Sequence, residues 1–377
     1  MVHKKRVVFV AAYSPEENLA GAKKIETIIQ LFTESGKRVL LVNTSHINSK
    51  FARTKITKSK VGDAKVVEIT PFTTPYRRLG KAINPIFCFF TRITSRCFKS
   101  SIVWLYNGYW FENVFALANK NNASLVYEIE DLPFSRDRGG LNLKDMLDGL
   151  SFKFAMKKAS AFTFVNAEIQ GRLCVADDKA KFILPTLLND RITQVNIQTP
   201  FQNSNSIRVG YFGGLDAEKG GTALLELIEN MPEGCRLTIS GKGSMADKIY
   251  NAAKQHPDVR YLGLIDEETL YREMNESDVL LNPHKPIKSS NNGIFPFKVC
   301  EYLYLRKLVI STELPVINEL VSNTVEIYSG DNKELSKLIL KSKDIYLSKQ
   351  QLIKEASQYI EINYSRSALR DFIVEKI

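Results

Sequence analysis

The chain has 377 residues, enough for two domains that each bury a hydrophobic core. Its apolar fraction of 44% and charged fraction of 25% are those of an ordinary globular protein and exclude a disordered or fibrous chain. No uninterrupted apolar run is long enough to span a bilayer. The five cysteines are scattered and form no Cys-x-x-Cys pair, which favours a reducing cytoplasm and argues against structural zinc.

The net charge of +11 is unevenly distributed. Residues 1–200 carry 30 Lys and Arg against 17 Asp and Glu, whereas the remaining residues carry 22 against 24. The basic excess therefore lies entirely in the first half and predicts an anionic partner there. A nucleic acid and an anionic membrane surface are the two candidates.

The chain opens with a strand, a helix and a second strand. Residues 5–12 form an apolar run too short for a signal peptide, residues 21–35 place apolar side chains at helical spacing, and residues 38–43 are β-branched and apolar. This β-loop-α-β order is how doubly wound α/β domains begin.

Residues 50–100 contain twelve Lys or Arg and only two acids, Asp63 and Glu68. Within residues 76–100 the basic side chains alternate with aromatic and aliphatic ones. Such a basic amphipathic segment suits docking on an anionic leaflet. The alternative is a core helix whose charged face is solvated. Nucleic-acid binding is disfavoured because no helix-turn-helix, RNP-type or zinc-finger pattern occurs.

Two further strands are predicted at residues 101–106 and 124–129, and the second runs into Glu128-Ile-Glu130-Asp131. Carboxylates at the carboxyl end of a parallel strand lie where α/β sheets bind ligands. The sequence around them does not fit a metal-binding Asp-x-Asp motif.

The α/β pattern restarts after residues 184–202, which contain no clear element. A strand at residues 207–212 is followed by a glycine-rich loop that holds Gly213, Gly214 and Lys219. Glycines allow close approach of the backbone to a pyrophosphate, and a lysine can neutralise it. The loop lacks the Gly-Lys-Ser/Thr of a Walker motif. Gly241 lies in a similar turn after the next strand.

A helix that begins near Pro296 carries Lys298 and Glu301 three residues apart, on one face close to its N-terminus. The free N–H groups and positive dipole at that end suit a diphosphate. Lys298 could add a charge, and Glu301 could accept hydrogen bonds from ribose hydroxyls. The alternative is a surface ion pair on an ordinary amphipathic helix.

The stretch Pro-Phe-Lys-Val-Cys-Glu-Tyr-Leu at residues 296–303, followed by Lys-Leu-Val-Ile-Ser, resembles the donor-binding signature of retaining GT-B glycosyltransferases of family 4. It is similar to the branch that has Pro-x-Lys-x-x-Glu-Tyr-Leu. The resemblance covers nearly the whole chain and is strongest from Arg208 to Ser311.

The resemblance implies an α/β GT-B fold, in which two Rossmann-like doubly wound domains face a cleft. Residues 1–188 would form the acceptor-binding domain, residues 189–206 a linker, and residues 207–355 the nucleotide-sugar-binding domain. Residues 356–377 would form a helix that crosses back onto the first domain.

The resemblance also assigns roles to residues. It places Lys219, Lys298, Glu130 and Asp131 in the catalytic centre. It places the donor against Gly213, Gly214, Gly241, Asn292, Gly293, Ile294, Phe295, Lys298 and Glu301, and the acceptor against Ser14, Asn18 and Gly21.

The chain departs from the family pattern at three positions. Gly214 replaces an arginine of the glycine-rich loop, and Gly293 replaces the first of two glutamates. Glu130 stands where the family has histidine, which leaves two roles open for it, a base-like contact with the acceptor or a structural loop acid.

The function implied is transfer of a sugar from a UDP- or GDP-sugar to a saccharide or polyprenyl-diphosphate-linked acceptor in bacterial surface polysaccharide synthesis. No metal and no further cofactor is expected, and the protein is expected in the cytoplasm, peripheral on the inner face of the membrane. Two alternatives are a GT-B-fold nucleotide-sugar epimerase and a non-catalytic polysaccharide-assembly factor.

Overall fold

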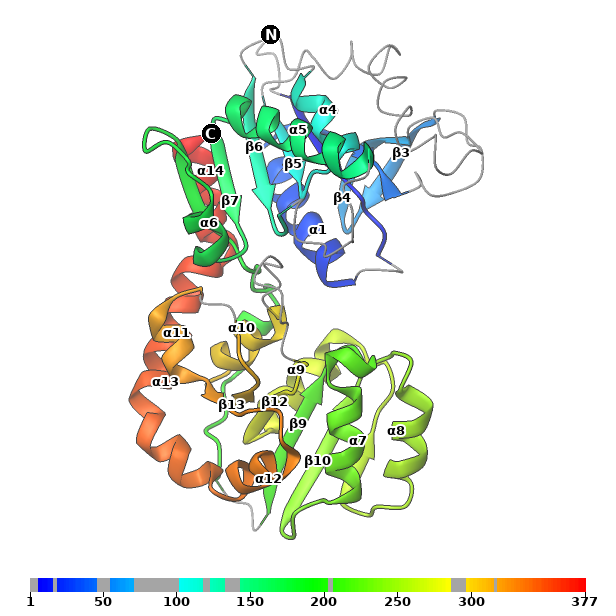
Figure 1. Ribbon diagram of the computed structural model, residues 1–377, viewed down its shortest axis with the longest axis vertical. Coiled ribbons are helices and arrows are strands. Elements are labelled where there is room, and N and C mark those ends of the chain that lie inside the picture. The colour runs from blue at the N-terminus through cyan, green and yellow to red at the C-terminus, as the bar shows by residue number, and fades with distance from the viewer. Residues whose placement is uncertain are drawn as a thin grey trace. The chain divides into compact units, whose positions relative to one another are not determined.

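The computed structural model describes residues 6–15, 19–45, 55–70, 102–117, 123–132, 143–202, 206–285, 296–314 and 317–377. The chain divides into two compact units (Figure 1). The first comprises Met1–Leu187, Ser289–Ile294 and Leu369–Ile377, and the second comprises Leu188–Lys288 and Phe295–Ala368. The basic segment 76–100 lies outside the described residues, as do Asn18 and residues 292–295.

The first unit contains an eight-stranded sheet in the order β3-β4-β2-β1-β5-β6-β7-β8. Its strands pair in parallel except β3, which is antiparallel to β4. Its elements are β1 (Arg6–Ala11), α1 (Leu19–Glu34), β2 (Arg38–Asn43), β3 (Lys55–Val61), β4 (Ala64–Thr70), β5 (Ile102–Tyr106), α4 (Trp110–Leu117), β6 (Ser124–Ile129), α5 (Leu143–Lys158), β7 (Ala161–Phe164), α6 (Ala167–Arg172), β8 (Ala180–Ile183) and, from Leu369 on, α14 (Arg366–Lys376).

Alternation along the strands sends every second side chain of β1 and β2 to one face of this sheet. On that face Phe9 and Leu41 pack with Phe32 of α1 in one buried cluster. The same cluster includes Leu369 and Phe372 of α14, so the end of the chain completes the core of the first unit. Apolar periodicity alone therefore accounts for α1 and α14.

The β3–β4 hairpin is the largest element that the sequence analysis did not identify. Its seven cross-strand pairs run from Lys55 opposite Thr70 to Val61 opposite Ala64. Gly62 turns the chain with a φ of 54°, a conformation that glycine adopts readily. The lysines of β3 obscured the alternation that normally predicts a strand.

The second unit contains a six-stranded parallel sheet in the order β11-β10-β9-β12-β13-β14. Its elements are η2 (Ile192–Gln194), β9 (Ile207–Phe212), η3 (Ala217–Lys219), α7 (Gly221–Glu229), β10 (Cys235–Ser240), α8 (Ala246–Ala253), β11 (Val259–Tyr261), α9 (Glu267–Glu276), β12 (Val279–Asn282), α10 (Phe297–Tyr304), β13 (Leu308–Ser311), α11 (Glu319–Thr324), β14 (Glu326–Ile327), α12 (Asn332–Leu340) and α13 (Ser342–Tyr364).

The expected strand at residues 207–212 has these bounds in the structure. α11 begins at Glu319, because the side chain of Asn318 caps it by accepting from the Leu320 N–H at 2.9 Å. The first expected helix begins at Leu19 and not at residue 21. Gly21, expected to contact the acceptor, is buried in the first turn of α1.

Candidate active site

Two glycine turns meet at the carboxyl ends of β9 and β10 in the second unit. A Cβ at Gly241 would lie 1.8 Å from the carbonyl oxygen of Gly213, so only glycine fits this contact. The Gly213 N–H donates to the Ser240 carbonyl at 3.0 Å, and the Gly241 N–H donates to Gly263 at 2.9 Å. The amides of both glycines are thus used within the fold, and the lack of a Cβ allows the two turns to pack together.

Lys219 lies over Gly214 in the first of these turns. A Cβ at Gly214 would approach Lys219 Cδ to 2.7 Å, so the glycine leaves room for the lysine stem. Lys219 pairs with Asp216 at 3.1 Å and keeps more than half of its side chain exposed. The Ser244 N–H and Lys219 lower the pKa of Asp216. The Lys219 ammonium therefore lies at the turn, pairs with one carboxylate and remains accessible to solvent.

Lys298 of α10 reaches the same turn. Its Nζ lies 4.0 Å from the centre of the Tyr211 ring, and a Cβ at Gly213 would be 3.3 Å from it. Burial and, to a smaller extent, the positive charge of Lys219 lower its pKa to about 7. Within the described part of the chain no carboxylate pairs with Lys298. The structure thus brings together two lysines that lie 79 positions apart in the sequence, of which Lys219 pairs with Asp216.

Glu301 lies one turn along α10 from Lys298. The buried Tyr271 hydroxyl of α9 donates to Glu301 Oε1 at 3.4 Å, and burial together with the Glu301 charge raises the pKa of Tyr271. Pro296, the residue before α10, makes no side-chain capping hydrogen bond to the helix.

Two tyrosines hold the turn and α10 in register. The Tyr302 hydroxyl accepts from the Phe212 N–H at 3.1 Å and donates to the Phe212 carbonyl at 3.0 Å. The Tyr211 hydroxyl lies 2.5 Å from the Gly214 carbonyl and 2.8 Å from the Lys219 carbonyl. Tyr302 lies inside the recognised Glu-Tyr-Leu stretch, but neither tyrosine was predicted as a site residue.

In the first unit Glu130 belongs to a charged network at the carboxyl end of β6. Lys24 of α1 lies 2.6 Å from Glu128 and 3.1 Å from Glu130, and only 2% of its side chain is exposed. The Trp104 indole donates to Glu128 at 2.8 Å, and the Tyr106 hydroxyl donates to Glu130 at 2.8 Å. Glu128 is therefore a buried structural acid, whereas Glu130 keeps about a fifth of its side chain exposed.

This network contains one lysine and two carboxylates. Burial alone would lower the pKa of Lys24, but the charges of Glu128 and Glu130 outweigh burial and raise it. Burial raises the pKa of Glu128 against the opposing effect of Lys24. One lysine thus holds two carboxylates, and Oε1 of Glu130 already accepts from two donors. That arrangement orients Glu130.

Two other predicted site residues of this unit, Ser14 and Asp131, lie within the described residues. Ser14 is half-buried after β1, and the Asp131 N–H donates to Asn107 at 3.3 Å.

No group of three or more His, Cys, Asp or Glu that could hold a metal occurs in the described ranges. Of the helices described, none is both long and apolar enough to cross a bilayer.

Comparison with known proteins agrees with this geometry. A family described as "Glycosyl transferases group 1" matches residues 206–342, from the residue before β9 to the start of α13. Every element around the two glycine turns and α10 lies within that match. No curated protein matches the chain.

Three solved structures are similar over nearly their whole length. Sucrose-phosphate synthase from Thermosynechococcus elongatus is 14% identical with a TM-score of 0.68, covering 99% of this chain and 98% of that one. HepE of Anabaena, solved with UDP and glucose, is 14% identical with a TM-score of 0.65, covering 99% of each chain. A UDP-forming trehalose-phosphate synthase from Burkholderia xenovorans, with glucose-6-phosphate, is 9% identical with a TM-score of 0.63, covering 98% and 99%.

At sequence identities of 9–14%, structural similarity shows the fold alone. Together with the two mainly parallel sheets it confirms the predicted α/β GT-B fold. The second unit also carries the glycosyl transferases group 1 match.

The Tyr302 contact generates a stability prediction. Replacing Tyr302 with Phe removes the partner of both Phe212 backbone groups, so we expect the free energy of unfolding to fall by about 1–3 kcal/mol in urea denaturation. Tyr304→Phe on the same helix is the control, because the Tyr304 hydroxyl has no hydrogen bond within the described residues. Equal losses in the two variants would refute a special role for Tyr302.

The Lys24 network generates a second prediction. Lys24→Met leaves a buried carboxylate without its cation and should lower the free energy of unfolding by about 3–5 kcal/mol. Lys24→Met combined with Glu128→Gln should recover part of that loss, because the buried negative charge is removed too. A double variant as unstable as the sum of both single variants would contradict this coupling.

Proposed function

We propose that the protein is a metal-independent retaining glycosyltransferase that uses a UDP- or GDP-sugar as donor, of the family 4 branch that the 296–303 stretch resembles. The observation that carries the proposal is the convergence of Lys219 and Lys298 on the Gly213–Gly214 turn, within the glycosyl transferases group 1 match. Asp216 pairs with Lys219, no carboxylate of the described residues pairs with Lys298, and a diphosphate would supply the missing negative charge.

Catalysis in this proposal is electrostatic. As the bond between the anomeric carbon and the diphosphate breaks, negative charge grows on the leaving phosphate oxygen. Lys219 and Lys298, which the fold holds in position before the reaction, stabilise that charge, as does the N-terminus of α10. The acceptor oxygen bonds to the anomeric carbon on the same face, and its proton passes to the leaving phosphate oxygen.

The remaining site residues hold the substrates. Glu301, oriented by Tyr271, accepts hydrogen bonds from the ribose hydroxyls. Backbone groups of residues 292–295 hold the donor sugar. In the first unit Glu130 binds an acceptor hydroxyl, and its contacts with Lys24 and Tyr106 support a binding role over a base-like one.

The titles of two similar structures support a nucleotide-sugar donor. HepE of Anabaena was solved with UDP and glucose, and the Burkholderia xenovorans enzyme is described as UDP-forming. We carry the UDP preference to this chain as part of the proposal, with a hexose as the transferred sugar.

The acceptor is proposed to be a polyprenyl-diphosphate-linked saccharide at the inner face of a bacterial membrane, in surface polysaccharide synthesis. The basic excess of residues 1–200 supports an anionic membrane partner for the peripheral protein. In this scheme residues 1–188 bind the acceptor, residues 207–355 bind the donor, and residues 189–206 link them.

A screen of nucleotides tests the donor site directly. The screen contains UDP, GDP, ADP, CMP and UDP- or GDP-sugars. Nucleotides with one particular base should raise the melting temperature of the protein, and by the same amount with and without EDTA. At a hundredfold excess over Kd the ligand adds about 2.7 kcal/mol of stability, a shift of several degrees. The Lys219→Ala, Lys298→Ala double variant should lose the shift, whereas Lys248→Ala on the exposed face of α8 should keep it.

The outcomes of this screen separate the alternatives. Stabilisation by no nucleotide would favour the non-catalytic assembly factor, and loss of the shift in EDTA would contradict metal independence. An altered nucleotide-sugar, recovered with its diphosphate still attached, would identify the epimerase.

The pKa of Lys298 predicts how affinity depends on pH. Because that pKa is about 7 without ligand and a diphosphate holds the ammonium protonated, binding above pH 7 takes up a proton. The Kd for the stabilising nucleoside diphosphate should therefore rise by up to about tenfold per pH unit above pH 7, as measured by calorimetry. Lys298→Arg, which stays charged, should flatten this slope, and an unchanged slope would refute the assignment.

A further inference from the structure

Asp216 lies between the two glycine turns of the second unit and uses its two carboxylate oxygens differently. Oδ1 accepts from the Ser244 N–H at 3.0 Å, across to the turn that follows β10. Oδ2 lies 3.1 Å from the ammonium of Lys219, in the turn to which Asp216 itself belongs. The first contact joins the two turns. The second places a negative charge beside one of the two lysines at the candidate donor site.

The contact with Ser244 accounts for one carboxylate oxygen of Asp216 and leaves the other unexplained. The backbone also holds the two turns together, because the Leu215 N–H donates to the Lys242 carbonyl at 2.8 Å. Asp216 directly precedes η3, but its side chain makes no capping hydrogen bond to that helix. Neither contact requires a negative charge next to Lys219, so the ion pair calls for a separate explanation.

The pair of Asp216 and Lys219 is open to water. The exposed fraction of the side chain is 57% for Lys219 and 43% for Asp216. Ion pairs of this kind contribute little to the stability of a fold, because water screens the attraction and competes for both groups. An incoming anion can therefore replace the carboxylate at Lys219 without disturbing the turn.

The two lysines at the Gly213–Gly214 turn differ in their counter-charge. A Cβ at Gly214 would lie 3.4 Å from Lys219 Nζ, and a Cβ at Gly213 would lie 3.3 Å from Lys298 Nζ, so both ammoniums reach this turn. In the described part of the chain Lys219 pairs with Asp216, and Lys298 pairs with no carboxylate. A diphosphate held by both ammoniums would come close to the Asp216 carboxylate, and the like charges would repel each other.

We propose that Asp216 is a counter-ion that competes with the diphosphate for Lys219 and thereby promotes release of the product. The inference rests on the proposed function, because the product concerned is the leaving diphosphate of that reaction. In the free protein Asp216 holds the Lys219 ammonium at the turn. The bound diphosphate takes over that ammonium, and Asp216 pairs with it again when the diphosphate leaves.

The charge of the ligand makes Asp216 selective between donor and product. A terminal phosphate has a second pKa of about 6, so at neutral pH the released nucleoside diphosphate carries one more negative charge than the nucleotide-sugar. The Asp216 carboxylate therefore repels the product more strongly than it repels the donor. The effect of Asp216 is to weaken binding of the product more than binding of the donor.

Asp216→Asn tests the proposal by calorimetry. The amide oxygen can still accept from the Ser244 N–H, while the negative charge beside Lys219 is removed. The Kd for inorganic pyrophosphate and for the stabilising nucleoside diphosphate should fall by about two- to fivefold, and the Kd for the nucleotide-sugar should fall less. Substitution of a residue that only holds the turns together would instead leave the Kd unchanged or raise it.

Two variants show whether the gain in affinity arises at Lys219. Glu218→Gln is the matched control, because Glu218 is exposed and adjacent to Lys219 in the sequence, but its carboxylate is not paired with that lysine. It should change the pyrophosphate Kd less than Asp216→Asn does. In a Lys219→Ala background, Asp216→Asn should have a much smaller effect than in the wild type, because the competition for Lys219 is gone.

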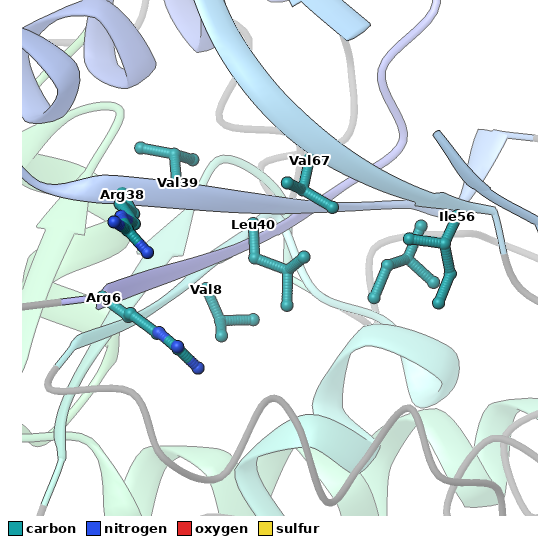
Figure 2. Close-up of a pocket in the computed structure, with 8 residues that line it drawn as sticks. Arg6, Val8, Arg38, Val39, Leu40, Ile56 and Val67 are labelled. Carbon is teal, nitrogen blue, oxygen red and sulfur yellow. The ribbon is translucent and has the colours of Figure 1, made fainter. Parts of the chain in front are cut away.

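A second cluster of cations in the first unit controls for pyrophosphate binding elsewhere. Figure 2 shows Arg6 and Arg38 at one end of a pocket of about 200 Å³. Arg38→Ala should leave unchanged both the pyrophosphate Kd and the gain produced by Asp216→Asn.

Several outcomes would overturn the proposal. They are an unchanged or raised pyrophosphate Kd in Asp216→Asn, pyrophosphate that binds neither form, and a gain that Arg38→Ala abolishes or that persists in full with Lys219→Ala. Failure of the glycosyltransferase proposal would look different. In that case Asp216→Asn would tighten pyrophosphate binding, which supports the counter-ion role, while no nucleotide would bind with a preference for its base and no sugar would be transferred.

Discussion

The hydroxyl of Tyr302 is the contact on which the candidate donor site depends. By accepting from one backbone group of Phe212 and donating to the other, it fixes α10 against the last residue of β9. The glycine turn begins at the next residue, so the position of the helix and that of the turn are set by one side chain. Lys298, four residues before Tyr302, is thereby placed over the Tyr211 ring.

Lys24 and Lys298 lie in two different environments. Lys24 is buried with two carboxylates, which raise its pKa and keep it charged whether or not a ligand is present. Lys298 is partly buried, against an aromatic ring and near another cation, and its pKa is lowered to about 7. The first arrangement stabilises a fold at the carboxyl end of β6. The environment of Lys298 offers no paired carboxylate among the described residues, which is typical of a group that binds an anionic ligand.

Much of the architecture could be predicted from the sequence, because it depends on local patterns. The apolar run at β9 predicted the bounds of that strand, and the motif around Lys298 and Glu301 indicated a phosphate-binding helix. The convergence of Lys219 and Lys298 on one turn follows from parallel strands β9, β12 and β13 ending at the same edge of the sheet.

Features made by long-range contacts could not be predicted. Gly241 is required by a contact with Gly213, and no spacing rule reports that two turns touch. The partner of Glu130 is Lys24, which lies 106 positions earlier on a different element.

The most direct test of the central claim is a crystal structure of the protein with the nucleoside diphosphate that stabilises it. The account predicts phosphate oxygens within hydrogen-bonding distance of Lys298 Nζ and Lys219 Nζ, at the N-terminus of α10, with the ribose against Glu301. A nucleotide bound away from the Gly213–Gly214 turn, or phosphates that contact neither lysine, would contradict it.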